Sequence, residues 1–488
     1  MRHPNGDAFT LDNRFRGGDT VANVTGVIDQ SFGLYRVQPT EGADYTAVNL
    51  RPAAPDDVGG NLTVASFNVL NYFTTLDLGP DICGPAEDQE CRGADNAEEL
   101  ARQQVKIVAA LAAMDSDVVG LIEIENHPGD VPTATLVNAL NAEVGAGTYD
   151  YVATGAIGSD AIRVALIYKP ASVTPVGGFA VLDSSVDVRF SDDHNRPVLA
   201  QAFAENASGG IVTVAVNHLK SKGSGCGGPP DDDPVQGNCN GTRTLAAEAL
   251  ADWLASDPTG SGDLDALVIG DLNSYDKEDP IDALRAAGYA ELVHQFQGEL
   301  AYSYLFDGQL GYLDTALASP TLASQVTGAT IWHINADEPD LLDYDTSFKS
   351  DAQDALFEPN AYRSSDHDPV IVGLDLAAFG FGGFEPPIDE ENTVRAGRTV
   401  TVKFSLDEAV DVDDVLFESM QVFDCGAWPL GESVDAASTG STELRYDAAD
   451  DQYVFTWKTD AEWAGECKAL VVTLSDGTYA IAEFEFRP

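Results

Sequence analysis

Positive charge is scarce in this sequence. Only 26 Lys and Arg stand against 80 Asp and Glu, so the formal net charge is −54 over 488 residues. A protein that holds nucleic acid through a broad basic surface is therefore excluded, because such a surface needs an excess of Lys and Arg. A chain this acidic repels itself in dilute buffer, whereas molar salt shortens the screening length to ~3 Å. The composition predicts a protein adapted to a salty medium.

Long apolar runs are also absent. The longest stretches, such as residues 107–114, fall well short of the ~18 residues that a membrane helix needs. We therefore expect no membrane span. Hydrophobic residues still make up 44% of the chain, which excludes wholesale disorder despite the charge. At ~150 residues per domain, the length predicts about three domains.

The sequence contains neither a C-x-x-C motif nor a Cys/His cluster, which argues against metal binding through sulfur. Its six cysteines fall as three local couples, and their spacing favours the following disulfides: Cys83 with Cys91, Cys226 with Cys239, and Cys425 with Cys467. Three disulfides indicate an oxidising compartment, and hence a secreted, extracellular protein. No apolar stretch of a signal peptide follows the first five residues, so we expect the export signal to lie upstream of this sequence.

Three regions follow one another along the chain. Residues 1–50 contain short alternating runs separated by glycine, which are typical of small antiparallel strands and of the end of a β-barrel. After a linker at 51–60, buried strand patterns alternate with helical ones from 61 to 377, which predicts an α+β sandwich with helices outside. A Gly/Pro-rich linker at 378–392 then leads to residues 393–488, whose half-buried strands predict a small β-sandwich.

The strands of the middle region each end in a polar cluster. The clusters are residues 66–68 (SFN), 123–126 (EIEN), 217–220 (NHLK), 270–273 (GDLN) and 365–368 (SDHD). Polar residues that directly follow buried strands gather at one rim of a layered α/β protein. Carboxylate and amide oxygens suit a hard divalent cation, and the two histidines suit proton transfer near neutral pH. Together these groups favour attack of water on a phosphate ester.

The five clusters occur in the order found in the endonuclease/exonuclease/phosphatase superfamily, which residues 61–376 resemble. Longer phrases are similar to extracellular endonucleases of the ExeM/NucH type: residues 121–126 (LIEIEN), 160–170 (DAIRVALIYKP), 217–223 (NHLKSKG) and 313–319 (LDTALAS). The resemblance implies a DNase I-like four-layer α/β sandwich. Residues 15–40 resemble the end of an OB-like domain that precedes such nucleases. The last region resembles a PxKF-type module, although Thr401 stands where that motif has proline.

The resemblance also implies roles for the metal and the attacking water. Glu123 is expected to ligate a catalytic Mg²⁺ or Mn²⁺, with Asn68 and Asp366 near it. Asp271 and Asn273 are expected to orient or deprotonate the water and to hold the phosphate.

Further residues are expected to transfer protons and to bind substrate. His218 would bind the phosphate or protonate the leaving oxygen, and His367 would be the second acid or base, oriented by Asp314. The expected contacts to substrate phosphates are Arg163, Lys220 and Arg243, through bidentate or point-charge interactions.

Several alternatives remain open for individual carboxylates. Strand alternation places Glu125 on the same face as Glu123, where it could support the metal site from behind or be merely structural. The acidic run Asp231, Asp232 and Asp233 reads as a solvated loop tip, with a structural Ca²⁺ as the alternative. A second acidic run at 411–414 is likewise expected to be a solvent-exposed loop.

The function expected from these features is that of a secreted, salt-adapted, metal-dependent endonuclease that acts as a monomer. Its expected substrate is DNA, and RNA stays open as a second substrate. One alternative is a phospholipid or sugar-phosphate hydrolase of the same superfamily, which would need an exposed apolar loop. The sequence suggests only residues 379–384 for that purpose. The other alternative is a non-catalytic adhesion protein built on the two β modules, against which the five polar clusters argue.

Overall fold

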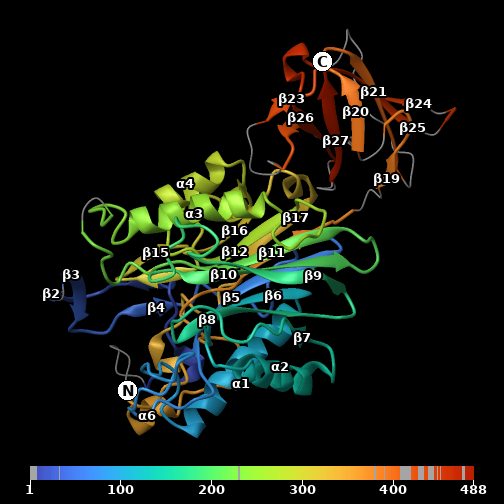
Figure 1. Ribbon diagram of the computed structural model, residues 1–488. Coiled ribbons are helices and arrows are strands. Elements are labelled where there is room, and N and C mark those ends of the chain that lie inside the picture. The colour runs from blue at the N-terminus through green and yellow to red at the C-terminus, as the bar shows by residue number, and fades with distance from the viewer. Residues whose placement is uncertain are drawn as a thin grey trace.

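The computed structural model describes residues 8–31, 33–228, 231–377, 381–388, 391–406, 419–426, 433–437, 444–447, 449–450, 452–474 and 479–488. Two six-stranded sheets lie face to face at the centre of the molecule (Figure 1). The first sheet has the order β17-β18-β5-β6-β8-β7, with the strands β5 (Leu62–Tyr72), β6 (Val118–Glu125), β7 (Asp150–Tyr151), β8 (Ile162–Tyr168), β17 (Val326–Ile331) and β18 (Val370–Leu374). The second has the order β13-β16-β12-β11-β10-β9, with β9 (Val173–Leu182), β10 (Arg196–Glu205), β11 (Ile211–His218), β12 (Ala266–Asp271), β13 (Ala290–Glu291) and β16 (Asp314–Ala318).

Helices cover the outer face of each sheet. Helices α1 (Ala97–Met114) and α2 (Val131–Val144) pack on the first sheet, while α3 (Asn240–Leu254) and α4 (Asp279–Ala286) pack on the second. The short helices α5 (Leu292–Gln297) and α6 (Asp351–Asp354) complete the domain. The α1 helix begins where the Asn96 side chain accepts hydrogen bonds from the amides of Glu98 and Glu99, which satisfies two donors that the helix itself leaves open. The predicted four-layer sandwich is confirmed.

The main core lies between the two sheets. Strands of both sheets contribute fully buried aliphatic side chains to it, such as Val64 and Leu62 from β5 and Val214 and Val216 from β11. These strands are apolar on both faces because helices cover the other side, as buried sheets require. The core therefore fixes both sheets rigidly, and the ends of their strands with them.

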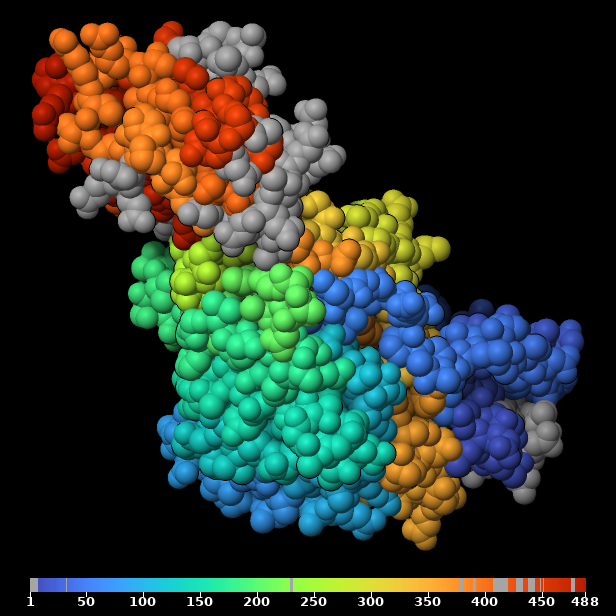
Figure 2. Space-filling model, turned by 90° about the vertical axis from the view of Figure 1, so that its right-hand side faces the viewer, coloured from blue at the N-terminus to red at the C-terminus, as the bar shows by residue number. Residues whose placement is uncertain are grey.

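The N-terminal region forms small ribbons against this domain. Within the described part of residues 8–50, β1 (Thr20–Ala22) pairs with β4 (Asp44–Thr46), and β2 (Gly26–Ser31) forms a hairpin with β3 (Leu34–Pro39). Figure 2 shows the atoms of this region, in blue, at one flank of the molecule. The region is attached through the Arg16 guanidinium, whose Nε donates to Glu338 Oε1 at 3.0 Å, while Arg51 binds the same carboxylate from the linker.

The C-terminal module is a β-sandwich, as predicted. One sheet contains β19 (Phe381–Phe384), β21 (Thr399–Leu406), β24 (Arg445–Asp447) and β25 (Gln452–Lys458); the other contains β20 (Glu391–Arg395), β22 (Ser419–Asp424), β23 (Val434–Asp435), β26 (Cys467–Thr473) and β27 (Tyr479–Arg487). Trp457 and Phe484 fill the space between them.

Two expectations for this part of the chain need comment. The segment 378–392 is not a linker throughout, because Phe381–Phe384 pairs with β21 as an edge strand, so the module begins earlier than expected. The acidic run at 411–414, like residues 378–380 and 389–390, lies outside the described residues. The helices of the described ranges include none that is long and apolar enough to span a membrane.

The three disulfides join the pairs expected from their spacing. Cys83 bonds to Cys91, Cys226 to Cys239, and Cys425 to Cys467. Two of them close loops of the domain built on the two six-stranded sheets, and the third ties β26 to the chain that follows β22 in the C-terminal module.

Candidate active site

The second sheet aligns four of the polar side chains through its strand register. His218 at the end of β11 is opposite Asp271 of β12, and Asp271 is in turn opposite Asp314 of β16. On the other side, Arg196 of β10 is the register partner of His218. Because neighbouring strands lie only ~5 Å apart, this register brings the four residues together in one row.

The first sheet contributes the carboxylate-rich side of the site. Glu123 occupies an irregular position of β6, with a φ of 66°, where the pairing with β8 shifts by one residue. The Asn71 amide donates to Glu123 Oε2 at 3.0 Å, and Glu123 Oε1 lies 3.9 Å from His218 Nε2. Such a bulge re-aims a side chain. Here it places Glu123 against the row formed by the second sheet.

The electrostatics around Glu123 suit a divalent cation. Burial, and then the neighbouring Asp366 carboxylate, raise the pKa of Glu123 above its ordinary value, although His367, Arg196 and Asn68 act in the opposite direction. The Glu123 and Asp366 carboxylates thus repel each other beside the Asn68 side chain, whose Oδ1 accepts a hydrogen bond from the Leu70 amide at 3.0 Å. Mg²⁺ and Mn²⁺ prefer ligands of this kind, so the residues present fit the expected metal.

His367 is held in one orientation by its neighbours. Its Nδ1 lies 2.7 Å from Asp314 Oδ2, which also accepts a hydrogen bond of 2.7 Å from the Ser303 hydroxyl. The Tyr304 ring stacks on the imidazole at a centroid distance of 4.4 Å. Although burial alone would lower the pKa of His367, the Asp314 and Asp366 carboxylates raise it well above its ordinary value. Asp314 and the stacked Tyr304 ring therefore hold the imidazole from two sides.

His218 differs from His367 in its surroundings. Its Nε2 lies 3.8 Å from Asp271 Oδ2, and its Nδ1 has no hydrogen-bond partner among the described residues. Burial, followed by the Arg196 guanidinium, lowers the pKa of His218 well below its ordinary value. Of the two histidines, His218 is the neutral one at pH 7 and His367 the protonated one.

Asp271 and Asn273 form a compact turn at the end of β12. The Asn273 amide donates to Asp271 Oδ1 at 2.8 Å, while the Asn273 side chain donates to the Leu219 carbonyl at 3.0 Å. Burial raises the pKa of Asp271 to about 7; His367 opposes the shift, and Asp314 adds to it. Asp271 is therefore poised to accept a proton near neutral pH.

Two of the three expected phosphate contacts do not reach this site. Arg163 is 1% exposed, and its guanidinium binds Asp130 at 2.9 Å and the Thr154 hydroxyl at 2.7 Å. Arg243 is fully buried, and it donates to the Lys220 and Asn238 carbonyls at 3.0 and 2.7 Å. Both assignments are wrong as substrate contacts, because each guanidinium is used inside the protein. Arg243 instead supports the backbone beside His218.

The positive charge near the site comes from other residues. The Arg196 Nε donates to Asp160 Oδ2 at 2.8 Å, and Arg92, directly after Cys91, binds the other oxygen of the same carboxylate at 2.9 Å. Both arginines and Lys220 contribute to the lowered pKa of His218. The Arg196 Nη1 is buried without a hydrogen-bond partner in the described part of the chain. Sequence reasoning missed Arg196 and Arg92. Arg196 begins β10, whereas the search of the sequence considered only residues that follow strands.

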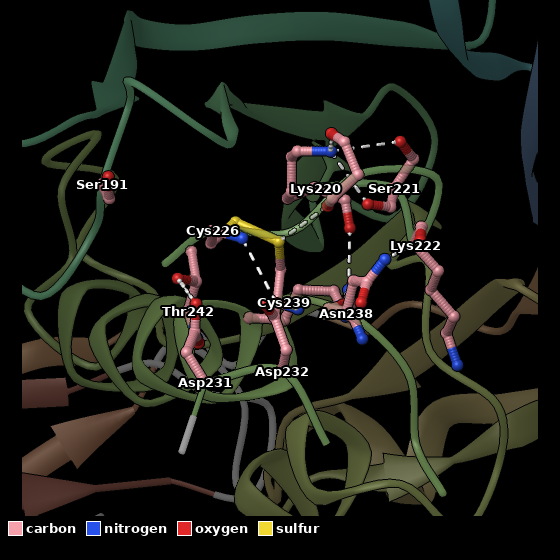
Figure 3. Close-up of a disulfide and its surroundings, with 12 residues drawn as sticks. Ser191, Lys220, Ser221, Lys222, Cys226, Asp231, Asp232, Asn238, Cys239 and Thr242 are labelled. Carbon is pink, nitrogen blue, oxygen red and sulfur yellow. Dashed lines mark hydrogen bonds between the residues drawn. A yellow bond between two sulfur atoms is a disulfide. The ribbon is translucent and has the colours of Figure 1, made fainter. Parts of the chain in front are cut away.

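The loop after His218 is braced by the second disulfide. Figure 3 shows Lys220 and Ser221 above the Cys226–Cys239 bond, with the Lys220 Nζ donating to the Ser221 carbonyl at 2.9 Å. The acidic run in the same loop is used by the backbone. Asp231 accepts from the Thr242 amide at 2.5 Å, and Asp232 accepts from the amides of Cys226 and Cys239 at 3.2 and 3.0 Å.

These hydrogen bonds argue against the alternative that the acidic run binds a structural Ca²⁺. Asp233 likewise accepts from the amides of Val235 and Gln236, both at 2.7 Å. All three side chains thus act as turn and helix caps, which gives the acidic run a role that needs no cation.

Glu125 does not share the face of Glu123. The shift in register at Glu123 breaks the expected alternation, and Glu125 Oε2 accepts from the amides of Thr74 and Thr75 at 2.7 and 3.1 Å. Its other oxygen lies 4.0 Å from Cys83 Sγ. Glu125 therefore holds the turn after β5 and is not among the residues around the metal site.

Several known proteins are similar to this chain. Three solved structures are similar over most of their own length. They are an endonuclease/exonuclease/phosphatase family protein from Bacteroides thetaiotaomicron (18% identity, 64% of this chain and 93% of that chain, TM-score 0.40), the human Nocturnin catalytic domain (16%, 67% and 94%, 0.39) and Sphingomyelinase C from Streptomyces griseocarneus (14%, 64% and 99%, 0.35). No curated protein sequence gives a significant match. The model of the Endonuclease/Exonuclease/phosphatase family matches residues 65–367, more than half of the chain, and the protein belongs to that family.

Proposed function

We propose that the protein is a secreted, salt-adapted, divalent-metal-dependent endonuclease that hydrolyses phosphodiester bonds of DNA. The observation that carries the proposal is the row of Arg196, His218, Asp271 and Asp314 on one sheet, facing Glu123 from the other. With His367, which lies 2.7 Å from Asp314, this arrangement combines a phosphate-binding cation, two imidazoles and a cation-binding carboxylate within one site. Three disulfides and the charge of −54 support secretion into a salty medium.

In the proposed mechanism each side chain has a separate task. Asp271, oriented by the Asn273 amide, accepts the proton of the attacking water. His218 donates a hydrogen bond to the phosphate, and His367, held by Asp314, protonates the leaving oxygen. Glu123, Asn68 and Asp366 would hold the cation, whose chemistry is to neutralise charge that develops on the phosphate.

Plasmid DNA provides the direct test. With Mg²⁺ or Mn²⁺ we expect conversion of supercoiled plasmid to nicked and then linear forms, and with a chelator no conversion. The same assay with RNA in place of plasmid shows whether RNA is a second substrate. Absence of nicking with either metal at any salt concentration would refute the assignment.

A first prediction concerns Arg196. Replacing it with alanine is expected to raise KM for DNA about tenfold and to make the salt dependence of binding shallower by about one phosphate contact. As a control, Arg163→Gln should lower the melting temperature, because it removes the buried partner of Asp130, without changing that salt dependence. A steeper or unchanged slope for Arg196→Ala would show that Arg196 does not contact the substrate backbone.

A second prediction concerns salt. DNA binding normally weakens with salt, by a slope of about −0.9 per neutralised phosphate, but few cations surround this site. Screening of the repulsion between DNA and the acidic chain acts in the opposite direction. We therefore expect nicking activity and melting temperature both to rise from dilute buffer to molar NaCl, measured at fixed Mg²⁺. A steep fall in activity at constant melting temperature would contradict the salt-adapted proposal.

One structural feature favours a second candidate function, that of a phospholipid hydrolase. The hairpin of β14 (Tyr304–Phe306) and β15 (Gln309–Gly311) begins at the residue that stacks on His367, and it exposes Phe306, Leu305 and Leu310. The sequence had suggested an apolar loop only at 379–384, so this expectation is corrected. A sphingomyelin emulsion, assayed beside DNA, separates the two candidates: Phe306→Ser would lower hydrolysis of the lipid selectively if the hairpin contacts it.

A further inference from the structure

A groove leads away from the catalytic residues and is not used by the chemistry described above. Its volume is about 630 Å³, which falls in the range of ligand sites. Asp366 and Tyr304 lie at the end nearest the active site, and Phe15 contributes to it from the N-terminal region. The groove, called here the N-terminal groove, is therefore continuous with the catalytic centre.

The wall on the N-terminal side is firmly attached. The Gly17 amide donates to the Asp337 carbonyl at 2.7 Å, and a Cβ on Gly17 would lie 2.9 Å from Asp337 Oδ1. Arg16 is buried and binds both Asp337 and Glu338, at 3.4 and 3.0 Å. Phe15, the residue before Arg16, is therefore held in place at the groove, where its ring packs at 4.5 Å from that of Tyr45.

The opposite wall is the β14–β15 hairpin. Tyr304 lines the groove and stacks on His367, so this wall is positioned by the catalytic histidine itself. Leu305, the next residue, also lines the groove and is 44% exposed. Both walls thus present aromatic or aliphatic side chains.

The charge of the groove excludes a phosphate. Its lining includes the carboxylates of Asp307, Asp337, Glu338 and Asp340 in addition to Asp366. Its two cations are already bound to carboxylates, Arg16 to Glu338 and Arg363 to Asp340. The net field is therefore negative and repels a phosphodiester backbone, whereas an uncharged planar group that carries amino donors is tolerated.

We propose that the N-terminal groove is a nucleobase subsite, which takes the base of a nucleotide adjoining the scissile phosphate between Phe15 and the β14–β15 hairpin. The proposal rests on the proposed nuclease function and names the part of the substrate that the acidic groove accepts. A base stacks on aromatic side chains without regard to its sequence, while the phosphates stay on the side of Arg196 and Arg92. The N-terminal region is thereby part of the substrate-binding surface.

The experiment uses short single-stranded oligonucleotides in which every linkage except one is protected against hydrolysis. The nucleotide on either side of the open linkage carries a base or is abasic. Wild-type protein with Mg²⁺ is expected to lose about tenfold in kcat/KM when the base on one particular side is removed. Phe15→Ala should show the same loss on the intact substrate, through KM and not kcat, and should be indifferent to removal of that base.

Two further variants make the result decisive. Leu305→Ser weakens the opposite wall without disturbing the packing of Phe15 on Tyr45, and it should reproduce the raised KM. Phe348→Ala, at a side chain that is 93% exposed and does not line the groove, should behave as wild type. Equal cleavage of intact and abasic substrates by the wild type would overturn the subsite and leave the nuclease function standing. Cleavage of neither oligonucleotide by protein that nicks plasmid DNA would overturn the subsite alone, and cleavage of neither without plasmid nicking would overturn both proposals.

Discussion

Alanine in place of His367 is expected to lower kcat for DNA cleavage at least ~100-fold, the low end for loss of a positioned acid or base. The imidazole is buried, hydrogen-bonded to Asp314 at 2.7 Å and stacked on Tyr304, so it occupies one orientation before substrate binds. The same loss is expected for His218→Ala, because nothing else among the described residues fills its place between Glu123 and Asp271. Plasmid nicking and single-turnover cleavage measure the effect.

The controls separate proton transfer from folding. Both alanine variants should melt within a few degrees of the wild type, because His218 ends β11, His367 precedes β18, and neither belongs to the core between the sheets. Asp314→Asn keeps the shape of the orienting residue but removes its charge, and it should cost less than loss of His367 itself while shifting the pH profile. Near-native cleavage by His367→Ala would refute its role as the acid, and near-native cleavage by His218→Ala would refute its role in binding the phosphate.

Glu123→Gln is expected to reduce activity by at least ~10³-fold at standard Mg²⁺, since charge stabilisation by a bound cation accounts for several kcal/mol of the barrier. The glutamine retains the size of the side chain and its contact with the Asn71 amide, but it removes one of the two carboxylates that face each other. Isothermal titration with Mn²⁺ should show weakened binding in the variant.

Glu125 offers a matched control on the same strand. It is a buried glutamate two residues further on, yet its carboxylate holds the amides of Thr74 and Thr75. Glu125→Gln should therefore lower the melting temperature and leave Mn²⁺ affinity unchanged. If both variants lose metal affinity equally, the cation lies elsewhere than at Glu123.

The expected architecture and most of the site follow from the order of elements. Strand and helix periodicity predicts the layered sandwich. The polar clusters meet at one edge of the sheets, where some strands end and their antiparallel neighbours begin; the cluster 365–368 therefore precedes β18 and does not end a strand. Asp314, His367 and Asp271 lie together for this reason. The predictions that failed concern residues in the interior of helices and strands. Arg163 and Arg243 carry the right charge, but tertiary packing directs them to Asp130 and to loop carbonyls, which local sequence does not reveal.

The misplaced Glu125 has a similar physical origin. Alternation holds only in a regular strand, and one additional residue in β6 reverses which face later side chains occupy. The φ of 66° at Glu123 is the cause, and no glycine marks the position in the sequence. Exposure of the β14–β15 hairpin could likewise not be read from the sequence, since apolar residues in short strands normally indicate burial.

Arg16 and Arg51 both bind Glu338, so the ion pairs cross the domain boundary that the sequence predicts near residue 61. The Glu338 carboxylate is buried and accepts from both guanidiniums, although they precede the sandwich in sequence. Removing one partner of a buried ion pair commonly costs ~3–5 kcal/mol, a large share of the stability of a typical domain. We therefore expect the N-terminal region and the sandwich to unfold as one cooperative unit, so that a stable truncated form would have to begin well before the first core strand.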